Sequence, residues 1–186
     1  MNDLLRKLPI GIQTFEKLRK GDYLYVDKTE LVWKIAYTST PYFLSRPRRF
    51  GKSLLLSTFE AYFEGKKELF EGLAIEKLET KWEKHPVLHL DLNAEKYDSP
   101  ERLYDILSRQ LTLWEIQYGI DENTLSGRFS GVIRRAYEQT GSSVVVLVDE
   151  YDKPLLQALG NDVLLDEYRK TLKAFYGVLK SADRYL

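Results

Sequence analysis

The sequence predicts an α/β layered fold with a mostly parallel sheet, and three observations support this class. Short apolar runs typical of strands alternate with longer helical patterns, which is the order expected when helices connect parallel strands. The run Val144–Val148 is apolar at every position, as in a strand that is covered on both faces of a parallel sheet. Because no linker or repeat divides the 186 residues, we expect a single domain over residues 1–186.

The first half of the chain predicts an extended segment, two helices and a short strand. Alternating aromatic and aliphatic residues after Gly21 indicate an extended segment to Asp27. Thr29 can cap a helix that reaches Tyr37, since the apolar residues that follow it share one face. The remaining elements are a buried strand at Tyr42–Leu44, a loop over Ser45–Gly51, and a helix that begins at Lys52 and ends at Gly65.

The second half alternates strands and helices more clearly. Val87–Leu92 reads as a strand, because its apolar residues alternate and polar residues follow it. Helical spacing then covers Pro100–Tyr118 and Phe129–Thr140, and Gly141 follows the second of these as a stop signal. After the Val144–Val148 strand, a long amphipathic helix over Asp162–Ala182 completes the order.

Composition excludes several kinds of site. The 28 basic and 28 acidic residues cancel, so a polyanion partner would have to bind a local patch. The absence of cysteine excludes disulfides, thiolate zinc sites and cysteine nucleophiles, and it suits a reducing compartment. The longest aliphatic run, Val144–Val148, is far shorter than a membrane span. We therefore expect a cytoplasmic protein without a membrane partner.

Gly51-Lys52-Ser53 is the sharpest local motif, because it lies between an apolar run and the start of a helix. At a helix N-terminus the backbone N–H groups and the dipole favour an anion, while a lysine can reach outer phosphates and a serine hydroxyl can bind Mg²⁺. A full phosphate-binding loop also has a glycine five positions before Gly51, where this chain has Arg46. The neighbouring Pro47 lacks an N–H donor. Taken alone, the motif therefore also fits a solvated basic loop.

An acidic pair after the second apolar strand favours the phosphate-loop interpretation. Asp149 and Glu150 directly follow Val144–Val148, and ligand sites of open α/β sheets lie at the carboxyl ends of strands. Phosphate-loop NTPases place a metal-binding carboxylate there, which suits Asp149. Glu150 suits a general base that polarises the attacking water. Asp152 is expected to cap the helix that begins at Pro154.

Three blocks of the sequence resemble the AAA-ATPase-like family of predicted bacterial and archaeal ATPases, many of which carry a C-terminal PD-(D/E)xK nuclease-like domain. The blocks are Tyr25–Thr29, Phe43–Leu54 and Val148–Leu155, and the likeness covers almost the whole chain. The arginine-rich loop without its first glycine is a trait of the family. The resemblance implies a P-loop NTPase-type three-layer sandwich that binds ATP and Mg²⁺.

The resemblance also implies a role for individual residues. Ser53 and Asp149 would hold the metal, and Glu150 would be the catalytic base. Members of this kind continue into a further strand that carries a polar sensor residue, and this sequence stops at Leu186, about where that strand should begin. We therefore expect the sandwich to be incomplete at its C-terminus, as in a fragment or a truncated product without the nuclease-like domain. The expected nucleotide-binding residues are Arg46, Arg48, Arg49, Phe50, Gly51, Lys52, Ser53 and Leu54.

Two functions follow from these expectations. The first is an ATP-binding domain that hydrolyses ATP with Mg²⁺, coupled to an unknown process. The alternative is a non-catalytic binding or regulatory module whose basic loop contacts nucleic-acid phosphates or an acidic protein, since phosphate contacts come chiefly from such side chains. A nucleotide is the expected ligand, and a nucleic acid, a protein partner and a second copy of the chain stay open as partners.

Overall fold

The computed structural model describes residues 6–38, 40–47, 49–93 and 96–186. By its internal contacts the chain divides into two compact units, Met1–Lys84 and His85–Leu186, and each is described by itself. The single domain expected over residues 1–186 stays a prediction. None of the helices in the described ranges is both long and apolar enough to cross a membrane.

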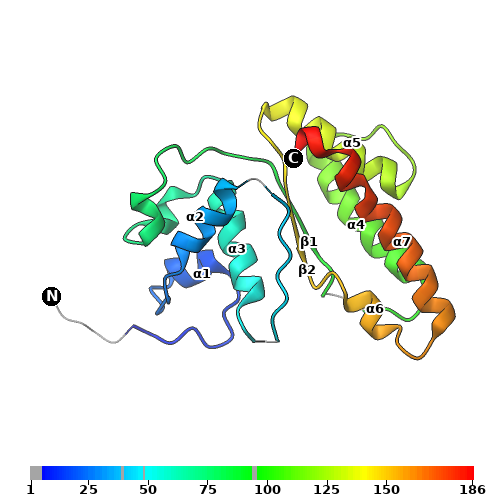
Figure 1. Ribbon diagram of the computed structural model, residues 1–186, viewed down its shortest axis with the longest axis horizontal. Helices are drawn as coiled ribbons and strands as arrows, with labels where there is room; N and C mark the ends of the chain where they lie inside the picture. Colours follow the sequence, from blue (N-terminus) through cyan, green and yellow to red (C-terminus); the bar gives the residue numbers. More distant parts are fainter. Residues whose placement is uncertain (1–5, 39, 48, 94–95) are drawn as a thin grey trace. The chain divides into compact units, whose positions relative to one another are not determined.

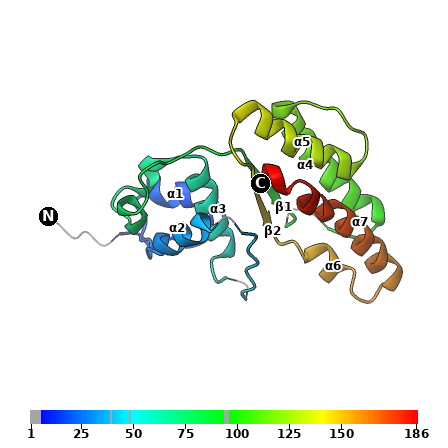
Figure 2. The same ribbon diagram turned by 45° about the horizontal axis from the view of Figure 1, so that its top comes forward.

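The first unit is formed by short helices (Figures 1 and 2). Helix α2 follows the prediction from Thr29 to Tyr37, and α3 begins at Lys52 as expected and ends at Phe63. Gly65 adopts a left-handed φ of 69° just after α3, which is the conformation that ends helices and suits glycine. The other helical elements are α1 (Phe15–Lys20) and the 3-10 turns η1 (Lys67–Phe70) and η2 (Ala74–Lys77).

Aromatic side chains form the core of the first unit. Phe15 and Phe70 are fully buried, and their ring centroids lie 4.9 Å apart. The Phe70 ring also packs against Trp82, and Tyr62 makes T-shaped contacts with both of these rings. Such contacts between large rings hold a small helical unit together because each ring removes much apolar surface from water.

The strand expected at Tyr42–Leu44 is wrong. Residues 40–47 form neither helix nor strand, and the side chains of all three residues are exposed. Prolines stand at positions 41 and 47, immediately before and soon after the apolar run. Because proline has no backbone N–H to donate to a neighbouring strand, the two prolines make this segment unfavourable as a strand.

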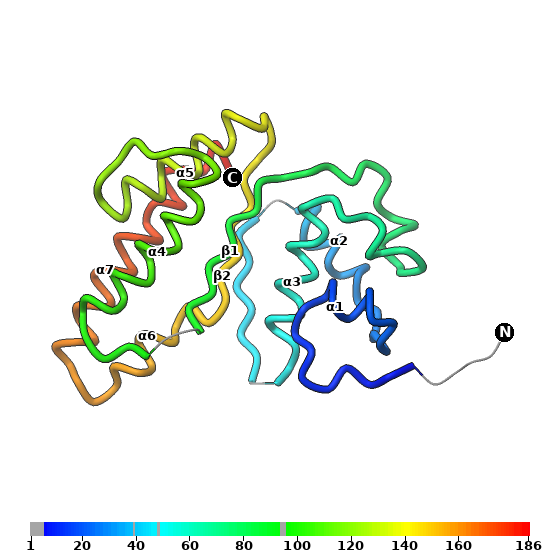
Figure 3. The backbone as a smooth tube through the Cα atoms, turned by 180° about the vertical axis from the view of Figure 1, so that it is seen from behind, coloured from blue at the N-terminus to red at the C-terminus, as the bar shows by residue number. Residues whose placement is uncertain are grey.

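The second unit packs helices beside a parallel pair of strands (Figure 3). Helix α4 matches the predicted bounds Pro100–Tyr118. Helix α5 (Leu125–Thr140) begins four residues before the predicted start, where Thr124 caps it by accepting a hydrogen bond from Gly127 N. The remaining elements are β1 (Val87–Asp91), β2 (Val145–Asp149), α6 (Lys153–Gln157), α7 (Asp162–Ser181) and the 3-10 turn η3 (Asp183–Tyr185).

Strands β1 and β2 pair in parallel, with Val87 opposite Val145 and Asp91 opposite Asp149. This parallel pair is compatible with the predicted α/β class, whereas the three-layer sandwich stays a prediction. Leu147 and Asp149 are buried, and the three valines of β2 are only half-buried, so the expected cover on both faces holds in part.

Helices α4, α5 and α7 form the core of the second unit. The Phe129 and Phe175 rings of α5 and α7 stack with centroids 4.4 Å apart, and Trp114 of α4 stacks on Phe129. A buried ion pair joins α4 to α5: Arg128 Nε and Nη2 donate to the two carboxylate oxygens of Glu115 at 2.8 and 2.7 Å. This two-point geometry fixes the register of the two helices, because a guanidinium and a carboxylate match in only a few orientations.

Candidate functional site

The predicted phosphate loop leads directly into α3 in the first unit. Gly51 is the N-cap of α3 and has a left-handed φ of 75°, and Arg49 is left-handed too, with a φ of 67°. A Cβ added at Gly51 would meet no atom within 4 Å, so this position needs glycine for its backbone conformation and not for space. Gly51 has no side chain to accept hydrogen bonds from the first-turn N–H groups, which suits a helix end that receives an anion.

Lys52 closes the loop on itself. Its Nζ donates a hydrogen bond to the backbone carbonyl of Arg46 at 3.0 Å, across six residues. Arg46 stands where a full phosphate loop would have its first glycine, so the loop curls here with an arginine in place of that glycine. The ammonium group of Lys52 is therefore held over the loop by a backbone acceptor that a phosphate oxygen could replace.

The other loop residues differ in exposure. Arg46, Arg49 and Phe50 are exposed, with 64% of the Phe50 surface open to solvent, while Ser53 and Leu54 are half-buried in the first turn of α3. Arg48 lies outside the described residues. The exposed guanidinium groups place positive charge around the loop, as expected for a site that binds phosphate.

The predicted acidic pair lies at the carboxyl end of β2 in the second unit. Asp149 is 6% exposed, and its Oδ1 accepts a hydrogen bond from Glu150 N at 2.9 Å. Glu150 has a left-handed φ of 52°, which is uncommon for a residue with a side chain and marks a strained turn. Such outliers gather at functional sites, where the surrounding structure maintains the strain.

The end of β1 lies beside this turn. Asp91 is the register partner of Asp149, and its Oδ1 accepts a hydrogen bond from Asn93 N at 2.7 Å in a local turn. Lys153 donates from Nζ to the backbone carbonyl of Asn93 and to Asn93 Oδ1, at 2.8 Å for the latter. Lys153 therefore ties the segment after Glu150 to the end of β1, a role that the sequence reasoning missed. Asp152 stands at the N-cap position of α6, as predicted, but its carboxylate accepts no capping hydrogen bond from the N–H groups of that helix.

The loop and the acidic pair belong to different units, so each is described within its own unit. A shared metal site between Ser53 and Asp149 stays a prediction. Within the described residues, no group of three or more Asp, Glu or His side chains could by itself hold a metal ion.

The Tyr25–Thr29 block has a role that sequence reasoning also missed. Asp27 Oδ1 accepts hydrogen bonds from Thr29 N at 2.8 Å and Thr29 Oγ1 at 2.7 Å, and Asp27 Oδ2 accepts one from Ala74 N at 2.7 Å. Thr29 Oγ1 in turn accepts a hydrogen bond from Ile75 N at 3.1 Å, and Thr29 is fully buried. The hydrogen bonds from Ala74 N and Ile75 N thus attach η2 to the start of α2. An Asp two residues before a helix-starting Thr is a sequence signal for such a turn.

Two side chains of this block have shifted pKa values. Burial raises the pKa of Asp27, but the hydrogen bonds from Thr29 N, Ala74 N and Thr29 Oγ1 together lower it below its ordinary value. Burial also raises the pKa of Tyr25, whose ring packs edge-on against Phe15. Tyr25 therefore packs against the core of the first unit, whereas Asp27, which is exposed, holds the turn that joins α2 to η2.

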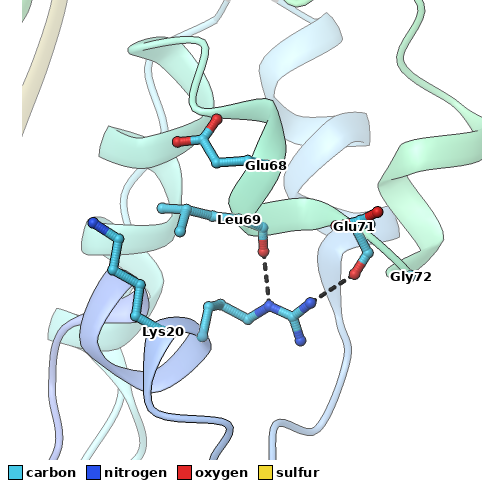
Figure 4. A pocket seen from close by; sticks show the side chains of 6 residues that line it. Lys20, Glu68, Leu69, Glu71 and Gly72 are labelled. Carbon is cyan, nitrogen blue, oxygen red and sulfur yellow. Dashed lines mark hydrogen bonds between the residues drawn. The ribbon is translucent and has the colours of Figure 1, made fainter.

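Two hollows in the first unit lie apart from the predicted site residues. The larger, of about 380 Å³, is lined by residues of α1 and of the segment around η1 (Figure 4). Arg19 lines it and donates from Nε to Leu69 O at 2.7 Å and from Nη2 to Glu71 O at 2.6 Å, so its guanidinium group holds the chain together. The second hollow lies between α1 and α3, and neither hollow is lined by a residue of the predicted loop.

Comparison with known proteins gives two matches. A family model described as "Predicted AAA-ATPase" matches residues 9–186. A protein of Azotobacter chroococcum mcd 1, described as an uncharacterized protein in the vnfD 5' region, is 42% identical over 187 residues. That alignment covers 97% of this chain and 36% of the relative, so the chain spans about a third of the relative's length. No solved structure matches the chain. From the family match over nearly all of its length, the chain belongs to the AAA-ATPase-like family of predicted AAA-ATPases.

Proposed function

We propose that this chain forms an ATP-binding P-loop domain that hydrolyses ATP with Mg²⁺. The observation that carries the proposal is the loop before α3, where Gly51 turns the chain into the helix and Lys52 reaches back to the Arg46 carbonyl. The match to a family of predicted AAA-ATPases also supports ATP as the ligand.

The loop supplies three kinds of group that suit a triphosphate. The first-turn N–H groups and the dipole of α3 favour negative charge at Gly51–Ser53. Lys52 would exchange the Arg46 carbonyl for an outer phosphate oxygen, a stronger acceptor because it is charged. Arg46 and Arg49 supply further exposed cations, which offset the loss of the first glycine and of the Pro47 N–H.

Ser53 and Asp149 would hold Mg²⁺ in this proposal. Both offer oxygen atoms, which this cation prefers as ligands, and Asp149 ends a strand as metal-binding carboxylates of such enzymes do. Mg²⁺ bound there would offset the negative charge that develops on the outer phosphates.

Glu150 would act as the general base. Its left-handed backbone turns the chain immediately after the strand, and its N–H is held by Asp149 Oδ1. A carboxylate in this place can accept the proton of the attacking water as the bond to the outer phosphate breaks. The strained turn is the feature of the second unit that supports this assignment.

Titration of labelled ATP with Mg²⁺ tests the binding step. We expect Lys52→Ala to lose binding, while Lys67→Ala, which removes an exposed lysine elsewhere in the same unit, binds as the unchanged protein does. Equal affinity in all three proteins would rule the proposal out. Hydrolysis is tested separately by Glu150→Gln, which should bind ATP but release no phosphate.

The exposed loop also favours a second candidate, a non-catalytic module that contacts a nucleic-acid backbone. Arg46 and Arg49 are exposed, and Phe50 next to them offers an open ring. Binding through several cations weakens steeply as salt rises. The candidate is excluded if the protein fails to bind single- or double-stranded DNA or RNA at low salt.

A further inference from the structure

Ser57 in the second turn of α3 attaches this helix to the start of α1. Its Oγ accepts a hydrogen bond from Phe15 N at 2.9 Å. Phe15 is the first residue of α1, and the N-cap residue Thr14 makes no side-chain hydrogen bond to this helix. Ser57 therefore caps α1 from another element and satisfies an N–H group that a helix start leaves without a partner in the helix.

The single proton of the Ser57 hydroxyl has two acceptors within reach. Leu54 O lies 2.9 Å away in α3, and Gln13 O lies 3.2 Å away in the segment before α1. Leu54 O also accepts a hydrogen bond from Thr58 Oγ1 at 2.8 Å. When the proton points to Gln13 O, Ser57 holds residues 13–15 at two points, and when it points to Leu54 O it holds them at one.

The two possible acceptors of the Ser57 proton connect the start of α1 with the first turn of α3, next to the loop. Leu54 stands in the first turn of α3, directly after Lys52 and Ser53. The first turn is only half-buried, whereas Thr58 and Phe59 in the second turn are buried. A ligand bound at the first turn would act on Leu54 O, which Ser57 Oγ and Thr58 Oγ1 both contact from the second turn.

We propose that Ser57 is a positioning residue that couples occupancy of the phosphate loop to the N-terminus of α1. The coupling rests on the proposed function, because it takes a nucleotide as the ligand of the loop. It adds a regulatory connection: whatever stabilises or displaces residues 13–15 changes nucleotide affinity, and a bound nucleotide changes the protection of Phe15 N–H.

Amide hydrogen exchange at Phe15, followed by NMR with and without Mg²⁺–ATP, tests the coupling. Without nucleotide, Ser57→Ala should speed the exchange of Phe15 roughly fivefold, since one hydrogen bond is lost. Ser181→Ala is the matched control, because Ser181 Oγ donates to Val178 O, three residues before it in its own helix. With ATP, Phe15 exchange should slow at least roughly twofold in the unchanged protein and stay unchanged in Ser57→Ala. Ser57→Thr, which keeps the hydroxyl, should restore the response.

The affinity for ATP gives the second measurement. Ser57→Ala should weaken binding roughly three- to tenfold through loss of the capping bond, and Ser57→Thr should recover most of it. An ATP response at Phe15 that persists in Ser57→Ala would overturn the coupling and leave the proposed function standing. Absence of ATP binding to the unchanged protein would overturn both. If Ser57→Ala unfolds the first unit, the test uses the unchanged protein and Ser57→Thr instead. A rate of Phe15 amide exchange that ATP leaves unchanged in both proteins would refute the coupling.

Discussion

The hydrogen bonds of the Thr29 hydroxyl to Asp27 and η2 allow a test of what stabilises the first unit. In Thr29→Val the side chain keeps its shape but loses the hydroxyl, which donates to Asp27 Oδ1 at 2.7 Å and accepts from Ile75 N at 3.1 Å. Thr29 is fully buried, so no water replaces the hydroxyl easily. The Ile75 N–H is then left without its acceptor.

The magnitude follows from these two contacts. A buried N–H without a partner costs about 1–3 kcal/mol, and loss of the bond to Asp27 adds about 1 kcal/mol. Water can solvate Asp27 because this residue is exposed, and the extra methyl group of valine offsets part of the cost. We expect a net loss of about 2 kcal/mol in the free energy of unfolding of the first unit.

Native-state amide exchange measures this loss for the first unit alone. Amides of α2 and α3 that open with the unit should exchange roughly 30-fold faster in Thr29→Val, whereas amides of α4 and α5 should keep their rates. The control is Thr38→Val at the other end of α2, where an exposed hydroxyl donates to Ile35 O. If both variants lose the same small free energy of unfolding, below about 0.5 kcal/mol, the Thr29 hydroxyl has no special role in stabilising the first unit and the prediction is wrong.

Three further predictions concern single groups. The pKa of Asp27 is lower in the folded chain than in the unfolded one, so ionised Asp27 stabilises the first unit above about pH 4. Unfolding measured at decreasing pH should show this stability lost below that value in the unchanged protein but not in Asp27→Asn. Arg128→Ala leaves Glu115 buried without its cation and should cost about 3 kcal/mol in urea unfolding of the second unit; a loss under about 1 kcal/mol would show that water reaches Glu115. Glu150→Gly should fold at least as stably as the unchanged protein, because glycine adopts the left-handed φ without strain, yet release no phosphate from ATP; a drop in melting temperature would contradict the strain argument.

Local signals in the sequence predicted the helices well. The bounds of α2 and α4 were predicted to the residue, and in α4 a proline at the start coincides with a regular apolar spacing. The capping role predicted for Thr29 is wrong, because Lys28 is the N-cap of α2 and Thr29 is its first residue. The start of α5 was predicted four residues late, although Leu125 lies on the same helix face as Phe129 and Thr124 can cap the helix. The intervening Ser126 and Gly127 weaken the helical pattern, so this start is clear only when the capping residue is considered.

Long-range partners could not be read from the sequence in the same way. The apolar run Tyr42–Leu44 has the composition of a strand, but a strand also needs a neighbour that accepts its hydrogen bonds, and composition does not report that neighbour. The contacts of Asp27 with Ala74 and of Ser57 with Phe15 join residues more than 40 positions apart. The sequence shows that these side chains can form hydrogen bonds, and only the fold shows with what.

The neutral net charge of the chain conceals a separation that the proposed function requires. Cations gather around Lys52 in the first unit, and Asp149 and Glu150 stand at the end of β2 in the second. A loop of cations attracts phosphate whether or not Mg²⁺ is present, whereas carboxylates repel phosphate unless a cation lies between them. In the proposed function, Lys52 serves the binding step and Glu150 the hydrolysis step, so a variant at Lys52 should lose ATP binding while a variant at Glu150 should lose only phosphate release. Loss of both steps in the Glu150 variant would contradict this division of roles.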